Sequence, residues 1–287
     1  MRRVLVTGGS GQLARAIERE ARGGADSYIL MSHDAMDICS GESIEEVLSR
    51  ERVDVVINCA AYTNVDGAED DEVRATETNG HAVERLAKVC HRRGIRLIHI
   101  STDYVYGGDR ERTTPYREVD DVAPINAYGR SKGVGERGVV EYGGIVVRTS
   151  WLYAPWGKNF VLTILRLAGE HKELSVVDDQ RGVPTSALGL ARMLVGLVAS
   201  GAVQTMGGIY HYSDGGETTW HGFAQEIVTM AGIEGCTIKA CSTAERNMRA
   251  ERPAYSVLNT ERIASIKGVE IAPWQERLKE VITIIKR

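Results

Sequence analysis

Short runs of consecutive apolar residues alternate with longer amphipathic segments through the first half of the chain. The apolar runs at 3–7, 28–31, 53–59, 95–101 and 144–148 predict strands, and the segments between them predict helices. An uninterrupted apolar run is typical of a strand that is covered on both faces. Regular strand–helix alternation predicts a parallel sheet with right-handed crossovers. The predicted fold class is therefore α/β, with a doubly wound parallel sheet.

The alternation becomes irregular from about Trp151, where Pro155, Gly157, Pro184 and Pro253 mark loops between shorter elements. Within this part, 187–200 predicts a helix and 208–212 predicts a strand, and both could return to the main sheet. We therefore expect a first domain of 1–150 joined by 187–212. A smaller, interleaved C-terminal lobe would consist of 151–186 and 213–287.

Composition and charge narrow the possible partners. The 287 residues are 43% hydrophobic, enough for one large core with a smaller companion lobe. Lys and Arg total 35 against 39 Asp and Glu with no dense basic run, so we expect no nucleic-acid partner. The five cysteines show no metal-site spacing, and no apolar stretch approaches the ~18 residues of a membrane span. We expect reduced thiols, no membrane association and a cytoplasmic location.

A glycine-rich turn, GGSGQLA, directly follows the first predicted strand and precedes a helical pattern. Gly8 and Gly11 let the backbone approach a pyrophosphate, whose charge the following helix N-terminus favours. Ala14 takes the third position of the motif and still permits close helix–strand packing. Such a turn predicts a Rossmann-type dinucleotide site, although tight strand-to-helix turns also need glycine for conformational reasons.

The second strand leads into Met31-Ser32-His33-Asp34, with no carboxylate at the place where one would bind an NAD ribose. Ser32 could bond a 2′-phosphate, so the cofactor is expected to be NADPH or NADH. Asp37 and Ile38 could cover the adenine, although an Asp there more commonly caps a turn. Residues 58–63 end the third strand, where ligands gather, and Ala60 is small enough to let a ribose approach.

Tyr128 and Lys132 lie four residues apart in AYGRSK and so share one face of a predicted helix. Bringing a tyrosine pKa near neutrality takes ~3 units, about 4 kcal/mol, which a desolvated Lys and a nicotinamide cation could supply together. Tyr128 would donate a proton to a carbonyl oxygen, Lys132 would stabilise the tyrosinate, and Thr102 would hold that oxygen. The alternative for Tyr128 and Lys132 is a surface aromatic beside a solvated cation.

These motifs resemble the extended short-chain dehydrogenase/reductase superfamily and, more narrowly, the dTDP-4-dehydrorhamnose reductase family. The resemblance rests on NCAAYTNVDGAE, STDYVYGG, the AYGRSK region, RTSWLYAPWGKNF, DDQRGVPTS and RPAYSVLNTERI, which span nearly the whole chain. It implies reduction of dTDP-4-dehydro-L-rhamnose to dTDP-L-rhamnose with Thr102, Tyr128 and Lys132 as the catalytic set. It also implies cofactor contacts from Tyr128 and Lys132 and from Gly11, Gln12, Leu13, Asp37, Ile38, Ala61, Tyr62 and Thr63.

The same resemblance implies that Thr102, Asp103 and Trp151 contact a nucleotide-sugar substrate. Trp151 is suited to a base or a sugar ring, although a lone Trp more often packs in a core. Asp103 could bond a sugar hydroxyl or cap a turn, and Tyr104 and Asn159 are similarly open. Arg252, beside Pro253, could bind the substrate diphosphate with both guanidinium nitrogens or lie in solvent.

Some members of the family form dimers through magnesium held by acidic residues on two helices. The matching places here are Ala16 and the Leu188-Gly189 region, which offer no carboxylate. We therefore expect no metal and a possible homodimer that is not metal-bridged.

Two other functions stay open. An epimerase or dehydratase of the same superfamily uses the same Tyr, Lys and cofactor, although dehydratases need a further acid/base pair. A non-catalytic regulatory subunit resembling methionine adenosyltransferase beta is the second alternative, and the intact Thr102, Tyr128 and Lys132 argue against it.

Overall fold

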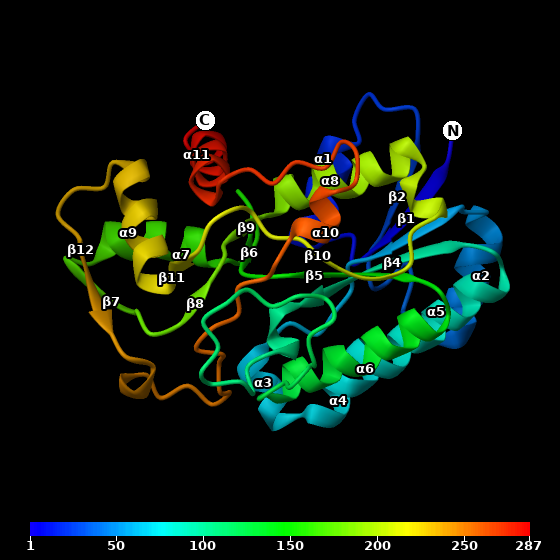
Figure 1. The fold of residues 1–287 in the computed structure, drawn as a ribbon. Coiled ribbons are helices and arrows are strands. Elements are labelled where there is room, and N and C mark those ends of the chain that lie inside the picture. The colour runs from blue at the N-terminus through cyan, green and yellow to red at the C-terminus, as the bar shows by residue number, and fades with distance from the viewer.

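A six-stranded parallel sheet runs through the larger part of this computed structural model, which describes residues 1–287 (Figure 1). The strand order is β10-β5-β4-β3-β1-β2, and every neighbouring pair is parallel. This confirms the predicted α/β class. The strands are β1 (Arg3–Thr7), β2 (Ser27–Met31), β3 (Val55–Asn58), β4 (Arg96–Thr102), β5 (Ile145–Thr149) and β10 (Gly208–His211).

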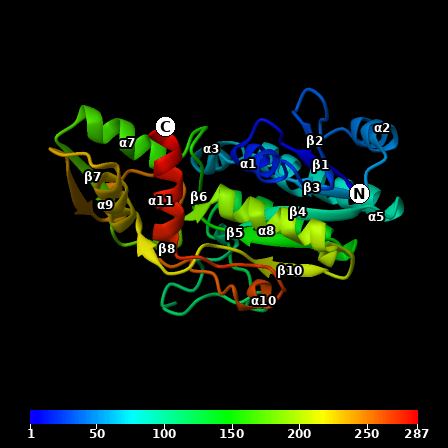
Figure 2. The same ribbon diagram turned by 90° about the horizontal axis from the view of Figure 1, so that it is seen from above.

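Helices cover both faces of this sheet, which explains the uninterrupted apolar runs. Alternate residues point to opposite faces, so Val4 and Val6 join the largest core while Leu5 joins a second one. The first face packs against α1 (Gln12–Glu20) and α8 (Ala187–Ser200), as Figure 2 shows from above. The second face packs against α2 (Gly41–Glu51), α5 (Ala82–Arg92) and α6 (Ala127–Glu141).

The connection from β3 to α5 is broken into three short helical elements instead of forming one continuous helix. α3 (Val65–Asp70), α4 (Glu72–Thr76) and a π-helical turn, η1 (Glu77–His81), all pack against α6. The π turn buries Asn79 completely between these elements. After β4, a short 3₁₀ turn, η2 (Asp103–Val105), leads the chain out of the sheet.

The second lobe lies beyond the carboxyl ends of the strands, at the left of Figure 1. Its helices are α7 (Phe160–Glu170), α9 (Trp220–Ala231) and α11 (Trp274–Ile285). Short two-stranded sheets pair β7 (Glu173–Val177) with β12 (Thr237–Cys241), β6 (Leu152–Tyr153) with β9 (Thr185–Ser186), and β8 (Arg181–Gly182) with β11 (Thr218–Thr219). The remaining elements are three short helices, η3 (Ala202–Gln204), η4 (Thr243–Glu245) and α10 (Glu261–Ala264).

The chain passes from the first lobe to the second and back. After β9, α8 packs on α1, and β10 then pairs with β5 at one edge of the main sheet. Both elements lie within the expected 187–212 segment, whereas the exact division into domains stays a prediction. Because the strands are parallel, Thr7, Asn58, Thr102 and Thr149 end on the same edge of the sheet, which faces the second lobe.

Candidate active site

The glycine turn after β1 fits a dinucleotide pyrophosphate. Gly8 has φ 65°, and an added Cβ would lie 2.9 Å from the Ala60 nitrogen, so only glycine suits this position. Gly11, at the N-cap of α1, provides no capping side chain, and the first turn holds no acidic residue. The N-terminal N–H groups of α1 are therefore suited to bind a phosphate.

Gln12 connects this turn to the second lobe. Its Oε1 accepts a hydrogen bond from Asn159 Nδ2 at 2.8 Å, and its carbonyl oxygen accepts one from Trp156 Nε1 at 3.1 Å. Asn159 also caps α7 through Leu162 N and donates to Ala154 O. Asn159 is thus placed as a tie between the two lobes, and its predicted substrate contact stays a prediction. The Leu13 side chain is buried in the main core.

The end of β2 lies directly against the glycine turn, since Gly9 N donates to the Met31 carbonyl oxygen at 2.8 Å. Ser32 follows at that point. Asp37 Oδ1 accepts from Cys39 N at 2.9 Å, the turn-capping role left open by the sequence, and Ile38 is buried. The predicted adenine contacts of Asp37 and Ile38 stay predictions.

The segment after β3 is held in place by Asn79, which is not among the predicted residues. Asn79 Oδ1 accepts from Tyr62 N at 2.8 Å, and its Nδ2 donates to Tyr62 O and to Ser131 Oγ on α6. Ala60 and Ala61 are half-buried there, and Thr63 is exposed. Because no residue pattern signals the π turn that places Asn79, the sequence offers no clue to this role.

Tyr128 and Lys132 lie on the first turns of α6. Asn126 caps this helix by accepting from Gly129 N at 2.7 Å, and Glu69 accepts from Ala127 N at 2.7 Å. Gly129 allows the helix to begin against the carbonyl of Tyr104, because an added Cβ would overlap that oxygen. The Tyr104 and Tyr128 rings therefore meet edge-on, with centroids 6.0 Å apart.

The Thr102 hydroxyl lies close enough to the Tyr128 phenol to affect its pKa, so the structure brings these two predicted residues together. Burial raises the pKa of Tyr128 to about 12, the nearby Thr102 hydroxyl lowers it in part, and Asp103 raises it further. In the chain alone, burial of the phenol has the largest effect on the Tyr128 pKa and Lys132 does not contribute to it. The lowering expected from Lys132 together with a nicotinamide cation stays a prediction.

The Lys132 side chain contacts the last residues of β4. Its Nζ donates to Ile100 O at 2.7 Å and lies 3.2 Å from His99 Nε2. Burial lowers the pKa of Lys132 to about 8, while Glu136 and Cys59 act in the opposite direction. Lys132 can therefore change its charge near neutral pH, which an exposed Lys does not do.

Asp103 is buried beside Thr102 at the start of η2. Its Oδ2 accepts from Ser256 Oγ at 2.6 Å, and its Oδ1 lies 3.2 Å from Thr102 Oγ1. Burial raises the pKa of Asp103 to about 7, although both hydroxyl bonds oppose this. Asp103 is thus a second group that titrates near neutrality within reach of Tyr128. Ser256 is an unpredicted partner, and it lies in the RPAYSVLNT stretch.

A groove of about 390 Å³ extends from Tyr104 into the second lobe. Apolar side chains of α7 and β7, together with Trp220 of α9, form much of its wall, and Arg246 and Arg252 line it as well. Trp151, at φ 45°, stacks on Trp220 with centroids 3.6 Å apart and planes 10° apart. Apolar walls with cationic groups suit a planar base attached to an anionic group.

Arg252 is held at this groove by Asp66. The two side chains make paired bonds of 3.1 and 2.9 Å, and Arg252 also donates to Ala250 O at 2.7 Å. Arg252 thus already makes the two-nitrogen contact with an anion that was expected for a diphosphate. Its contact with a substrate stays a prediction.

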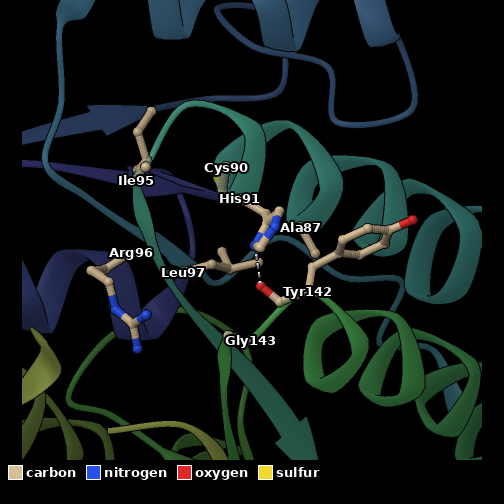
Figure 3. Close-up of a pocket in the computed structure, with 10 residues that line it drawn as sticks. Ala87, Cys90, His91, Ile95, Arg96, Leu97, Tyr142 and Gly143 are labelled. Carbon is tan, nitrogen blue, oxygen red and sulfur yellow. Dashed lines mark hydrogen bonds between the residues drawn. The ribbon is translucent and has the colours of Figure 1, made fainter. Parts of the chain in front are cut away.

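A second cavity, of about 110 Å³, lies at the opposite end of the sheet (Figure 3). Residues at the end of α5 and the start of β4 line it, and there His91 Nδ1 lies 3.1 Å from the Tyr142 carbonyl oxygen. None of the predicted site residues lines this cavity. The predicted catalytic residues lie instead at the carboxyl ends of the strands and at the start of α6.

No three His, Cys, Asp or Glu side chains gather in a way that could hold a metal ion. Where α1, α8 and α11 meet, Arg192 pairs with Glu20 at 3.0 Å and also with Glu280. Glu20 and Glu280 therefore share one cation that the chain itself supplies. No helix has the length and apolar character that crossing a bilayer requires.

The dinucleotide turn, the Tyr–Lys helix and the parallel sheet together define a class of proteins, the extended short-chain dehydrogenases/reductases, which are NAD(P)-dependent oxidoreductases. Within this class, the chain belongs to the family described as RmlD substrate binding domain, whose sequence model matches residues 1–287.

Similar proteins cover the chain almost completely. A dTDP-4-dehydrorhamnose reductase of Burkholderia thailandensis is 38% identical, over 95% of this chain and 95% of that protein. A dTDP-4-keto-6-deoxy-D-glucose reductase of Streptomyces niveus is 35% identical, over 99% and 97%. The crystal structure of dTDP-4-dehydrorhamnose reductase from Bacillus anthracis in complex with NADP is 34% identical and superposes with a TM-score of 0.92, over 99% of each chain.

Proposed function

We propose that this protein catalyses the NAD(P)H-dependent reduction of the 4-keto group of dTDP-4-dehydro-L-rhamnose to dTDP-L-rhamnose. Relatives that carry this name match the chain over nearly its whole length. The observation that carries the proposal is the approach of the Thr102 hydroxyl to the Tyr128 phenol at the carboxyl edge of the sheet. It lies between a phosphate-binding turn and a groove in which Tyr104 contacts Tyr128.

The bound nicotinamide supplies the hydride, and the residues of the chain supply the proton and the alignment. With a pKa raised to about 12, the Tyr128 hydroxyl is fully protonated at neutral pH and serves as the acid. Thr102 directs this hydroxyl toward the carbonyl oxygen, which takes the proton as it becomes an alcohol. Lys132 stabilises the resulting tyrosinate when it carries its own proton.

The groove would hold the nucleotide part of the substrate. Trp220 and Phe160 offer apolar surface for the base, while Arg246 and Arg252 offer positive charge for the diphosphate.

The test mixes the purified protein with dTDP-4-dehydro-L-rhamnose and NADPH, or NADH, and follows both loss of the reduced nicotinamide and formation of dTDP-L-rhamnose. The Tyr128→Phe variant is the control. Absence of turnover with both nicotinamides would contradict the proposal and favour a regulatory subunit.

A second candidate activity is reduction of dTDP-4-keto-6-deoxy-D-glucose, because a relative with 35% identity carries that name. Competition between the two keto sugars decides between these activities, since the preferred sugar has the higher kcat/KM. The cytoplasmic location, the possible homodimer without a metal bridge and the lack of nucleic-acid binding stay predictions.

A further inference from the structure

Three polar residues form one row across the main sheet, beneath the proposed site. Thr7 of β1 is in register with Asn58 of β3, which is in register with His99 of β4. All three side chains are almost completely buried. They share the face of the sheet that α6 covers, because the alternate residues Leu5, Val56 and Leu97 belong to that core. The row ends at Lys132, 3.2 Å from His99 Nε2.

The hydrogen bonds of this row fix the position of each hydrogen. Thr7 Oγ1 accepts from Ala60 N at 3.2 Å and lies 2.5 Å from Asn58 Oδ1. A separation of 2.5 Å is at the short end of the range for a hydroxyl donating to oxygen and is too short for an amide nitrogen as donor. Asn58 therefore turns its oxygen to Thr7 and its Nδ2 to His99 Nδ1, at 2.9 Å.

His99 Nδ1 is then an acceptor and carries no proton. Burial holds the pKa of His99 well below its usual range, so the ring is neutral, and its single hydrogen must be on Nε2. That hydrogen points at Lys132 Nζ. Only a neutral amine has a lone pair to accept it, while the amine itself donates to Ile100 O.

We propose that His99 is a positioning residue that donates its Nε2–H to Lys132 and stabilises the neutral form of the Lys132 amine. This inference rests on the proposed function for its catalytic meaning. In each reduction Tyr128 gives its proton to the substrate oxygen and the tyrosinate must regain one. A Lys132 ammonium that releases a proton becomes the amine that His99 stabilises, and solvent then restores the proton.

Other titratable groups face Lys132 from the neighbouring elements. Cys59, at the end of β3, is a neutral thiol because burial raises its pKa to about 12. Glu136 follows Lys132 by one turn on α6 and is paired with Arg148 of β5 through two bonds. His99 is thus the partner that lowers the proton affinity of Lys132 by hydrogen bonding.

The first test is ¹⁵N NMR of histidine-labelled protein, with the His99 signal assigned by its loss in His99→Met. We expect the Nε2–H tautomer in the wild type above pH 8, where Lys132 is a neutral amine. In Asn58→Asp a carboxylate replaces the amide donor, so we expect the His99 proton to move to Nδ1. An Nδ1–H ring or an imidazolium in the wild type at that pH would overturn the inference.

The second test is the pH dependence of kcat/KM. The wild type should lose activity as pH rises through about 8, where Lys132 loses its charge. His99→Met removes a donor to the neutral amine, so this limb should move up by about one pH unit. His211→Met, which removes another fully buried histidine without a bond to Lys132, should leave the limb in place.

The two tests separate the two claims. If folded His99→Met reduces the substrate and loses activity at the same alkaline pH as the wild type, the role of His99 is refuted and the proposed reductase activity is not. The expected tautomers in a protein that reduces neither keto sugar would refute the proposed function and leave the hydrogen-bond assignment standing.

Discussion

Replacing Asp103 with Asn should change how the stability of the protein depends on pH. Burial raises the pKa of Asp103 from 3.8 to about 7, a difference of ~3 units. At about 1.4 kcal/mol per unit, this corresponds to about 4 kcal/mol. Because the pKa is higher in the folded state, the folded protein binds this proton more tightly between the two values. The stabilisation is complete below pH ~4 and is lost as pH rises through about 7.

An Asn at this position cannot ionise but can keep the local hydrogen bonds. Its oxygen accepts from one neighbouring hydroxyl, and its amide donates to the other, since the hydroxyls of Thr102 and Ser256 can both reverse direction. Compared with Asp103→Asn, the wild type should therefore lose about 4 kcal/mol of unfolding free energy between acidic and mildly alkaline pH.

The assay is urea unfolding at a series of pH values, followed by tryptophan fluorescence. Asp121→Asn is the control, because Asp121 is exposed and makes no side-chain hydrogen bond or ion pair, so its curve should follow the wild type. Parallel curves for the wild type and Asp103→Asn would refute the argument, since they would mean that burial of Asp103 does not raise its pKa.

Three further changes test the site and its support. Tyr128→Phe should lower kcat at least ~100-fold with unchanged cofactor affinity, as expected for loss of a general acid, and near wild-type turnover would require another proton source. Arg252→Ala should raise KM far more than it lowers kcat in steady-state assays, and an unchanged KM would remove Arg252 from the substrate site. Gly129→Ala should reduce the free energy of unfolding, measured in urea, by about 3 kcal/mol, because the new Cβ would overlap Tyr104 O. The control is Gly133→Ala on the same helix, where a Cβ meets no neighbouring atom, so this change should be neutral or stabilising.

The sequence predicts the elements that depend on local pattern. The five strands before Trp151 lie within two residues of their predicted ends, and the helix at 187–200 is α8 itself. The glycine turn is equally local, since Gly8 needs both a positive φ and space beside Ala60. Each of these predictions rests on residues close together in the chain, where periodicity and steric limits act directly.

Contacts between distant segments escape such prediction. Asp66 and Arg252 are 186 residues apart, and only the folded chain brings them together. Asn159 is tied to Gln12 across 147 residues, and no pattern around either residue indicates it. The direction of the Tyr128 pKa shift also depends on the surrounding fold, because burial of the phenol has the largest effect on it. Lys132, one turn away in the sequence, does not determine this direction.

The contacts of Thr7, Asn58 and His99 can be predicted only in part, since they depend both on local pattern and on the pairing of distant strands. Each is a polar residue in or at the end of an apolar strand run, and a buried polar group must find a partner. In a parallel sheet the neighbours available to it are the residues in register, so the partners follow from the strand order and pairing. His99 stands at the end of this row, where the next partner has to come from the covering helix. Helix α6 supplies Lys132 as that partner. The pairing of the strands therefore influences the charge of Lys132, which follows the proposed proton donor Tyr128 on the same helix.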